Sequence, residues 1–166
     1  MPYRNSEQLN IDPLAKAKDS ALMYLEYRDR SVKEMRLKLN QKGYREEIIE
    51  RVLELLTKAK LLNDERFAIA FSRSKIEGRS WGPDKIRSEL YVKGIEKELI
   101  EGVIRKMYEE YNQFDLIRKL LTRRLRYQDT LEQKDMKRHI DFLKRRGFRW
   151  DAIREVITEY DNFKLE

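Results

Sequence analysis

The sequence contains no cysteine and only one histidine among its 166 residues. A chain without cysteine forms no disulfide, has no thiolate nucleophile and offers no sulfur ligand to a metal, which agrees with a reducing compartment. The sequence also lacks a glycine-rich phosphate loop, an HExxH zinc motif and a nucleophile elbow. We therefore predict a protein that is not an enzyme and that has no cofactor and no metal site.

Long apolar runs are also absent. No stretch approaches the roughly 18 apolar residues that a membrane helix requires, and residues 1–10 lack the apolar core of a signal peptide. These absences predict no membrane association and a cytoplasmic location. Residues 1–11 show no periodicity and are predicted to be a mobile N-terminal arm.

One pattern occurs three times along the chain, over residues 31–53, 82–104 and 135–157. The glycines of the three copies are 51 and 53 residues apart; they are Gly43, Gly94 and Gly147. Apolar residues recur at fixed distances from each glycine: Leu39, Leu90 and Leu143 four residues before it, and Val52, Val103 and Val156 nine residues after it. The same face of each copy is therefore predicted to be buried.

Each copy also begins with a residue type that can cap a helix, namely Ser31, Gly82 or Asp135. Ser31 and Glu34 match the capping box, and Gly82 is followed by a proline at the first helical position. An acidic residue four positions after each glycine suits the first turn of a further helix. The pattern predicts a capped helix, a glycine C-cap with positive φ, and a second helix.

Apolar residues at steps of three and four predict one more helix before each copy, and the first of these is expected over residues 12–29. No segment alternates with period two, so we expect no sheet. The predicted fold is all-α, with three tandem three-helix repeats, about nine helices, stacked into an elongated body that can curve. The predicted domains are the arm 1–11 and the repeats 12–62, 63–112 and 113–166.

The first helix of the second repeat is the least regular part of the pattern. We predict that Asn63 or Asp64 caps this helix and that the connection SKIEGRSWGPDK, residues 74–85 with Gly78, Gly82 and Pro83 as breaking residues, interrupts it. The residues predicted to form its buried face are Phe67, Ala70, Phe71 and Ser74.

Positive charge is concentrated in one region. The chain has a formal net charge of +7, and residues 113–150 hold 12 Lys and Arg against 5 Asp and Glu, so the remaining residues are neutral in sum. His139, the single histidine, occupies a position that is apolar in the other copies and is predicted to be a structural, inward-facing residue. The charge distribution favours an anionic partner at the third repeat.

Two runs in this region mix basic and aromatic residues, LLTRRLRYQDT and FLKRRGFRW. Guanidinium groups contact phosphates and aromatic rings stack on bases, so these runs are candidates for nucleic-acid contacts. An alternative is that they are ordinary amphipathic helices with a basic outer face. The candidate residues are Arg123, Arg124, Arg126, Lys144, Arg145, Arg146 and Arg149.

Several segments of the chain resemble the RecX family of recombinase regulators. They are ALMYLEYRDRSVKEM (21–35), LKLNQKG (37–43), LLNDERFAIAF (61–71), GPDKIRSELYVKGI (82–95) and FLKRRGF (142–148). The resemblance implies a non-catalytic, all-helical monomer that binds RecA and the RecA filament on single-stranded DNA. By limiting filament growth, or by lying in the filament groove, such a protein damps ATP hydrolysis and strand exchange in DNA recombination, repair and the SOS response.

The second-repeat motif of the family implies the filament contacts Lys85, Arg87, Glu89 and Lys93, with Asp64 as a cap and Phe67 as a core residue. Arg79 and Trp81 precede this motif in a loop flanked by glycines, and they either contact the partner or seal a junction between helices.

Two other functions remain open at this point. The cap–helix–glycine–helix unit could act as a helix-turn-helix module that binds duplex DNA without RecA. The chain could also be a protein scaffold that binds RecA and is indifferent to nucleic acid.

Overall fold

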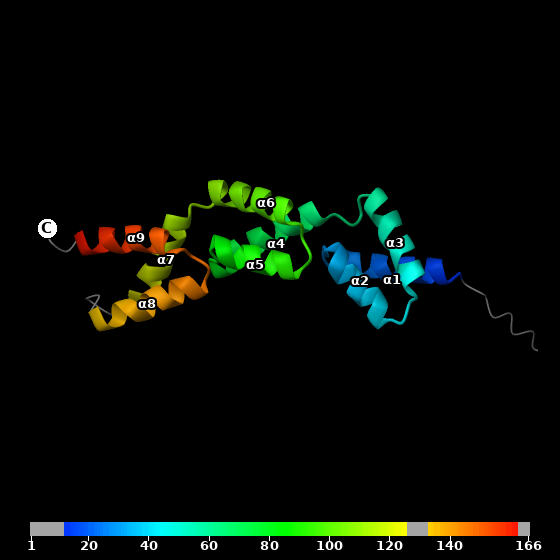
Figure 1. Cartoon of the computed structure of the whole chain (residues 1–166), viewed down its shortest axis with the longest axis horizontal. Helices are drawn as coiled ribbons and strands as arrows, with labels where there is room; N and C mark the ends of the chain where they lie inside the picture. The colour runs from blue at the N-terminus through cyan, green and yellow to red at the C-terminus, as the bar shows by residue number, and fades with distance from the viewer. Residues whose placement is uncertain (1–11, 126–132, 163–166) are drawn as a thin grey trace, which may run out of the picture. The chain divides into compact units, whose positions relative to one another are not determined.

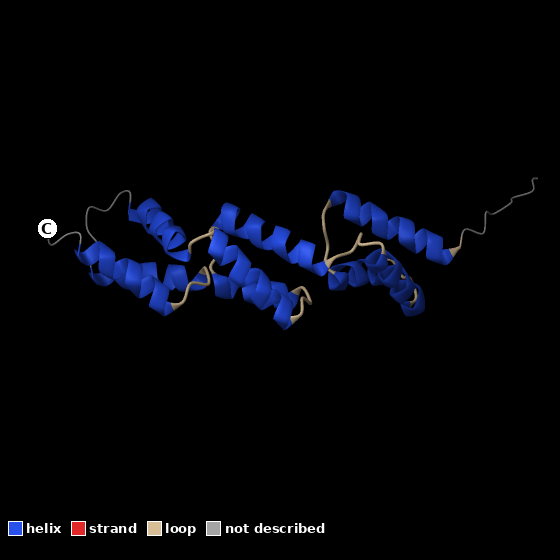
Figure 2. Ribbon diagram, turned by 90° about the horizontal axis from the view of Figure 1, so that it is seen from above, coloured by secondary structure: helices blue, strands red, loops and turns tan. Residues whose placement is uncertain are grey.

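The computed structural model describes residues 12–125 and 133–162, and all regular structure in these residues is helical (Figures 1 and 2). The helices are α1 (Pro13–Tyr27), α2 (Val32–Gln41), α3 (Glu46–Lys58), α4 (Asp64–Arg79), α5 (Pro83–Val92), α6 (Lys97–Glu110), α7 (Gln113–Leu125), α8 (Gln133–Arg145) and α9 (Trp150–Asn162). The predicted all-α fold of three-helix repeats is confirmed. The chain divides into two compact units, Met1–Asp64 and Glu65–Glu166.

The three repeated glycines lie where the sequence places them, at the ends of α2, α5 and α8. Gly43, Gly94 and Gly147 have φ values of +83°, +80° and +90°, in the left-handed region that glycine enters without a steric penalty. In each turn, the amide of the next residue donates to the carbonyl of the leucine four residues before the glycine, at 3.1–3.3 Å. This is the Schellman geometry, so the predicted glycine C-caps are confirmed.

The predicted N-caps are correct in two repeats. The Ser31 hydroxyl accepts a hydrogen bond from the Glu34 amide at 3.1 Å, and Gly82 precedes Pro83 at the start of α5. The predicted cap at Asp135 is wrong, because α8 already begins at Gln133. Asp135 therefore lies in the first turn, where the helix dipole favours a carboxylate.

The prediction for α4 needs two corrections. The helix continues through Gly78 and ends at Arg79, so residues 74–79 of the predicted connection SKIEGRSWGPDK are helical and the break lies in its second half. Its buried residues are Phe67, Ala68, Ser72 and Ile76, whereas Ala70 and Ser74 are exposed and Phe71 is only partly buried. The spacing of Ala68, Ser72 and Ile76 by four places them on one stripe, and Gly78 is tolerated because it is on the exposed side.

Asp64 caps a helix other than the one it begins. Its Oδ1 accepts a hydrogen bond from the amide of Val32, the first residue of α2, at 2.8 Å. The amides of the first helical turn have no partner inside the helix, so both the Ser31 hydroxyl and the Asp64 carboxylate satisfy donors at the start of α2.

Each repeat builds its own apolar core. The residues that the sequence predicts to be inward are buried in all three: Leu39, Leu90 and Leu143 are 0% exposed, and Val52, Val103 and Val156 are at most 3% exposed. The partly buried Leu116 of α7 packs against the cores of both the second and the third repeat. These two repeats therefore share apolar contacts within the second compact unit.

The end of α3 contains an unusual backbone conformation. Lys60 has φ +56°, and the Leu61 amide following it donates to the Leu56 carbonyl at 2.9 Å. A side chain in this left-handed region is strained, so Lys60→Gly should raise the free energy of unfolding by about 0.5–1 kcal/mol. Urea unfolding followed by circular dichroism would measure the change. The neighbouring Ala59, with φ −75°, provides the control, since Ala59→Gly should lower stability by a similar amount. Equal destabilisation by both variants would contradict the strain at Lys60.

Candidate nucleic-acid interface

Four cations surround two aromatic rings of the second repeat. The Phe71 and Trp81 rings meet edge to face, with centroids 6.3 Å apart. The cationic groups of Lys75, Arg79 and Lys85 lie 5.5, 5.9 and 5.4 Å from the Trp81 centroid, and Lys93 Nζ lies 5.2 Å from the Phe71 centroid. These six residues form the repeat 2 cluster, in which each cation is within cation–π range of a ring.

The loop that carries Trp81 is held in place by a hydrogen bond from α6. Ser80 follows the last residue of α4 and has φ +49°, and the hydroxyl of Tyr108 in α6 donates to the Trp81 carbonyl at 2.6 Å. Burial raises the pKa of Tyr108 well above its usual range, so this hydroxyl remains a donor. Trp81 itself is partly buried against the core of the second repeat, so it closes the junction between the helices. The same ring is also in contact with three cations of the cluster.

The third repeat holds a second group of cations and rings. The guanidinium carbons of Arg124 and Arg146 lie 4.3 and 5.0 Å from the centroid of the same ring, that of Phe142. Lys144 Nζ lies 5.5 Å from the centroid of Trp150, the first residue of α9. The residues Arg124, Phe142, Lys144, Arg146 and Trp150 form the repeat 3 cluster.

His139 is a buried residue that holds one member of this cluster, Arg124, in place. It is 4% exposed, as the inward prediction requires, and its Nδ1 accepts a hydrogen bond from Arg124 Nε at 3.2 Å. Burial lowers the pKa of His139, and the nearby Arg124 lowers it further. A neutral histidine that accepts from Arg124 explains how this guanidinium is held beside Phe142.

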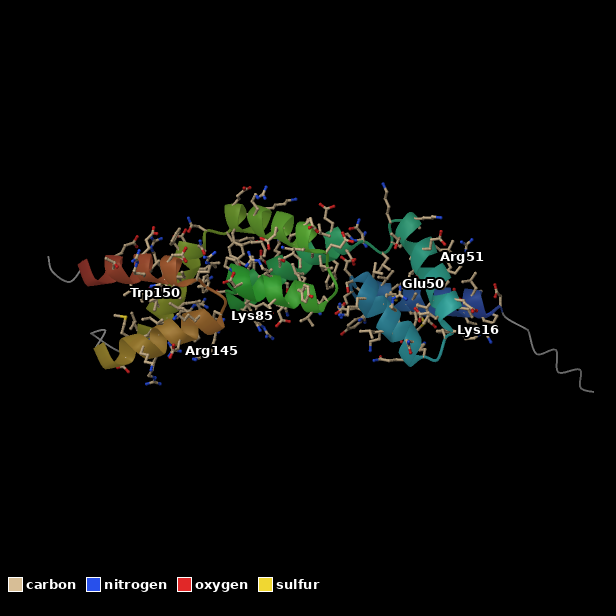
Figure 3. All side chains as sticks on the ribbon, viewed as in Figure 1. Lys16, Glu50, Arg51, Lys85, Arg145 and Trp150 are labelled. Carbon is tan, nitrogen blue, oxygen red and sulfur yellow. The ribbon has the colours of Figure 1, made fainter. Side chains whose placement is uncertain are left out.

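The two clusters meet at the turn between α8 and α9, which packs against the start of α5 (Figure 1). The Gly82 amide donates to the Arg146 carbonyl at 2.7 Å, and the Asp84 amide donates to the Gly147 carbonyl at 3.0 Å. The Arg146 guanidinium also donates to the Arg79 carbonyl. Figure 3 shows Lys85 on α5 and Arg145 at the end of α8, on either side of this junction.

Few acids neutralise this surface. Among the described residues, Lys85 pairs with Glu89 at 2.9 Å, whereas Lys75, Arg79, Lys144 and Arg145 make no ion pair. Burial lowers the pKa of Arg146, and the positive charges of Arg79 and Arg124 lower it further. Guanidiniums that repel one another without a nearby carboxylate are the arrangement expected at a site for an anion.

Arg87 lies outside the repeat 2 cluster. It faces α6, where it pairs with Glu101 at 2.7 Å, and also with Asp84. The first repeat contains the equivalent ion pair, between Arg36 and Glu50 of α3. These two residues occupy the same positions relative to Gly43 as Arg87 and Glu101 occupy relative to Gly94. The Arg87 hydrogen bond lowers the pKa of Glu101, as expected for a pair between helices.

The third repeat does not contain this ion pair. At the equivalent positions of the third repeat, Ile140 replaces Arg87 and Arg154 replaces Glu101. Part of the positive charge of this repeat therefore arises where the other repeats hold a neutral pair.

The structure places the remaining predicted contacts in different surroundings. Glu89 pairs with Lys85, and Arg149 is 3.7 Å from Asp151 in an exposed pair that contributes little to stability. Arg123 is exposed on α7, and Arg126 lies outside the described residues. All the predicted contacts stay predictions. Sequence reasoning missed Lys75 and assigned Phe71 to the core, although the spacing Phe71, Lys75, Arg79 by four indicates one helix face.

Other kinds of site find no support in residues 12–125 and 133–162. No helix there is long and apolar enough to cross a membrane. No group of three or more acidic or histidine side chains is placed to hold a metal ion in the same residues.

The fold and this surface define an all-α protein of three-helix domains in which basic and aromatic side chains gather over two successive domains. Three family models match the chain: the first three-helix domain of RecX at residues 17–56, the second at 63–104 and the third at 110–157. The chain belongs to the RecX family of regulatory proteins.

Individual relatives agree with this assignment. Regulatory protein RecX of Halalkalibacterium halodurans is 45% identical over 100 residues, which cover 60% of this chain and 38% of that protein. Regulatory protein RecX of Clostridium botulinum strain Eklund 17B is 31% identical over 168 residues, covering 97% of this chain and 78% of the relative. The crystal structure of RecX from Lactobacillus salivarius matches with a TM-score of 0.80 and 27% identity, over 90% of this chain and 97% of that one.

Proposed function

We propose that this protein is a non-catalytic regulator of the RecA recombinase. It binds RecA and the RecA filament on single-stranded DNA, limits filament growth, and thereby reduces ATP hydrolysis and strand exchange. The proposal places the protein in the cytoplasm, in DNA recombination, repair and the SOS response. Family membership supports a regulatory role, whereas binding to the RecA filament and the limitation of its growth are our inference.

The observation that carries the nucleic-acid part of this proposal is the junction of the repeat 2 and repeat 3 clusters. Lys75, Arg79 and Lys144 have no acidic partner among the described residues, and the positive charges of Arg79 and Arg124 both act on Arg146. A filament that carries a DNA strand offers closely spaced phosphates, each of which can neutralise such cations and release counterions.

The charges of the helices argue against a helix-turn-helix reader of duplex DNA. Such a module inserts the helix that follows its turn into the major groove, close to phosphates. Here the helices that follow the three glycines are α3, α6 and α9, and each contains more acidic than basic residues. Their negative charge would be repelled by the DNA backbone, so the basic surface is a better candidate for contact.

The proposed function predicts a direct effect on the RecA filament. Substoichiometric protein, added to RecA filaments on single-stranded DNA, should slow ATP hydrolysis and remain bound when the filaments are sedimented. Because the protein acts on the filament, a single-stranded-DNA-dependent ATPase of another family should be unaffected at the same concentration.

Each alternative gives a different result in this assay. Slowing of both ATPases would mean that the protein only covers DNA. Retention on filaments with no salt-dependent affinity for bare DNA would indicate a protein scaffold, and tight binding to one duplex sequence without RecA would indicate a helix-turn-helix reader. Unchanged RecA hydrolysis at excess protein, without retention, would refute the proposal.

A further inference from the structure

The contact between Gly82 and Gly147 joins two separate halves of the basic surface. We propose that this Gly82–Gly147 contact assembles a composite phosphate-binding site from Arg79 of the second repeat and Arg124 and Arg146 of the third. The ligand is the phosphodiester backbone of a single nucleic-acid strand. This inference rests on the proposed function for the identity of its ligand.

The start of α5 depends on the third repeat for its hydrogen bonds. Gly82 has no side chain that could cap the helix, unlike Ser31 at the equivalent position of α2. The Asp84 amide instead donates to the Gly147 carbonyl, and the Gly82 amide to the Arg146 carbonyl. The α8–α9 turn thus performs the capping that side chains perform in the first repeat.

Both glycines are required by the closeness of the two backbones. A Cβ atom added at Gly82 would lie 2.5 Å from the Gly147 carbonyl oxygen. One added at Gly147 would lie 2.5 Å from Lys85 Cβ and 2.8 Å from Lys85 Cα, as well as against the Lys85 amide. These are distances that no Cβ can accept, so any side chain at either position would separate the repeats.

The contact also fixes the positions of the cations. It holds Arg146 against the Arg79 carbonyl, while Arg124 and Arg146 both lie over the Phe142 ring and the positive charges of Arg79 and Arg124 both act on Arg146. Their mutual repulsion opposes the contact, and a bound phosphate would remove that repulsion. Binding and the contact should therefore stabilise each other, because coupling between two sites is reciprocal.

The chemistry of the site favours phosphates over bases. Guanidiniums bind phosphate oxygens through paired hydrogen bonds. The nearby rings are already covered by the protein's own cations: Trp81 by Lys75, Arg79 and Lys85, and Phe142 by Arg124 and Arg146. Recognition should therefore be independent of base sequence.

The test changes the geometry of the site without changing its charge. Gly82→Ala should lower the affinity for a fluorescent oligothymidylate about tenfold, and should reduce the slope of log affinity against log salt by about 0.7 for each phosphate that is no longer bound. Gly78→Ala is the matched control, because a Cβ at Gly78 meets nothing within 4 Å, and it should bind like the unmodified protein. Inorganic polyphosphate should compete with the oligonucleotide for the unmodified protein, which separates phosphate recognition from base recognition.

A second measurement on the unmodified protein covers the case in which Gly82→Ala does not fold. Oligothymidylate should slow hydrogen exchange at the Gly82 and Asp84 amides more than at the Glu34 amide, whose acceptor is Ser31 of the first repeat. Equal binding by folded Gly82→Ala and Gly78→Ala would overturn the proposal. So would the absence of selective protection, of oligonucleotide binding, or of competition by polyphosphate. RecA is absent from these assays, so their failure is distinct from a failure to slow RecA hydrolysis.

Discussion

Gly147→Ala is expected to lower the free energy of unfolding of the second compact unit by about 3 kcal/mol, and Gly43→Ala that of the first by only about 1 kcal/mol. Both glycines have a positive φ that alanine tolerates poorly. Only at Gly147 does the added methyl group also meet a backbone, that of Lys85, whereas nothing lies within 4 Å of a Cβ at Gly43. The difference between the two variants therefore measures the packing of the third repeat against α5.

The two tryptophans make this comparison direct. Trp81 and Trp150 both belong to the second unit, so tryptophan fluorescence reports the unfolding of that unit alone. Gly147→Ala should lower the midpoint of the fluorescence transition in urea. Gly43→Ala should leave it in place and shift only the transition seen by circular dichroism. Equal destabilisation by the two variants would show that the Lys85 backbone moves away from the added methyl group at little cost in free energy.

Removing four exposed or unpaired cations of the second compact unit is expected to weaken the salt dependence of single-stranded DNA binding. The slope of log affinity against log salt should fall by roughly 2 to 3, at about 0.7 for each phosphate contact. The variant replaces Arg79, Arg123, Lys144 and Arg145 by glutamine. None of these side chains makes an ion pair or hydrogen bond with a described residue, so their replacement should leave the fold intact. Arg124 is spared because its Nε holds His139.

The matched control removes the same number of charges from the first unit. Lys16, Lys18, Lys38 and Arg45 are replaced by glutamine, so both variants have the same net charge. Arg36 is retained because it pairs with Glu46 and Glu50. Binding should change little in the control when measured by fluorescence anisotropy across a salt series. If affinity and slope fell equally in both variants while each still folded, net charge alone would govern binding.

About half of the candidate site was predictable from the sequence. The family resemblance pointed to Lys85 and Lys93, which the structure places in the repeat 2 cluster, and the charge distribution pointed to Arg124 and Arg146, which it places in the repeat 3 cluster. Arg87 was included because it shares the motif of α5, but it faces α6 instead. Lys75 was missed because it lies in the segment SKIEGRSWGPDK that was predicted to be a connection, whereas α4 continues to Arg79 and aligns Phe71, Lys75 and Arg79 on one face.

The sequence by itself determined the local structure: where α2, α5 and α8 end, which leucines and valines face inward, and that no sheet forms in the described residues. These features depend on residues a few positions apart, through helical periodicity and the conformational freedom of glycine. Only the tertiary structure decided that Asp64 caps α2 and that Gly147 packs against α5. Those contacts join residues 32 and 63 positions apart, and they depend on how closely two backbones approach, which no local pattern encodes.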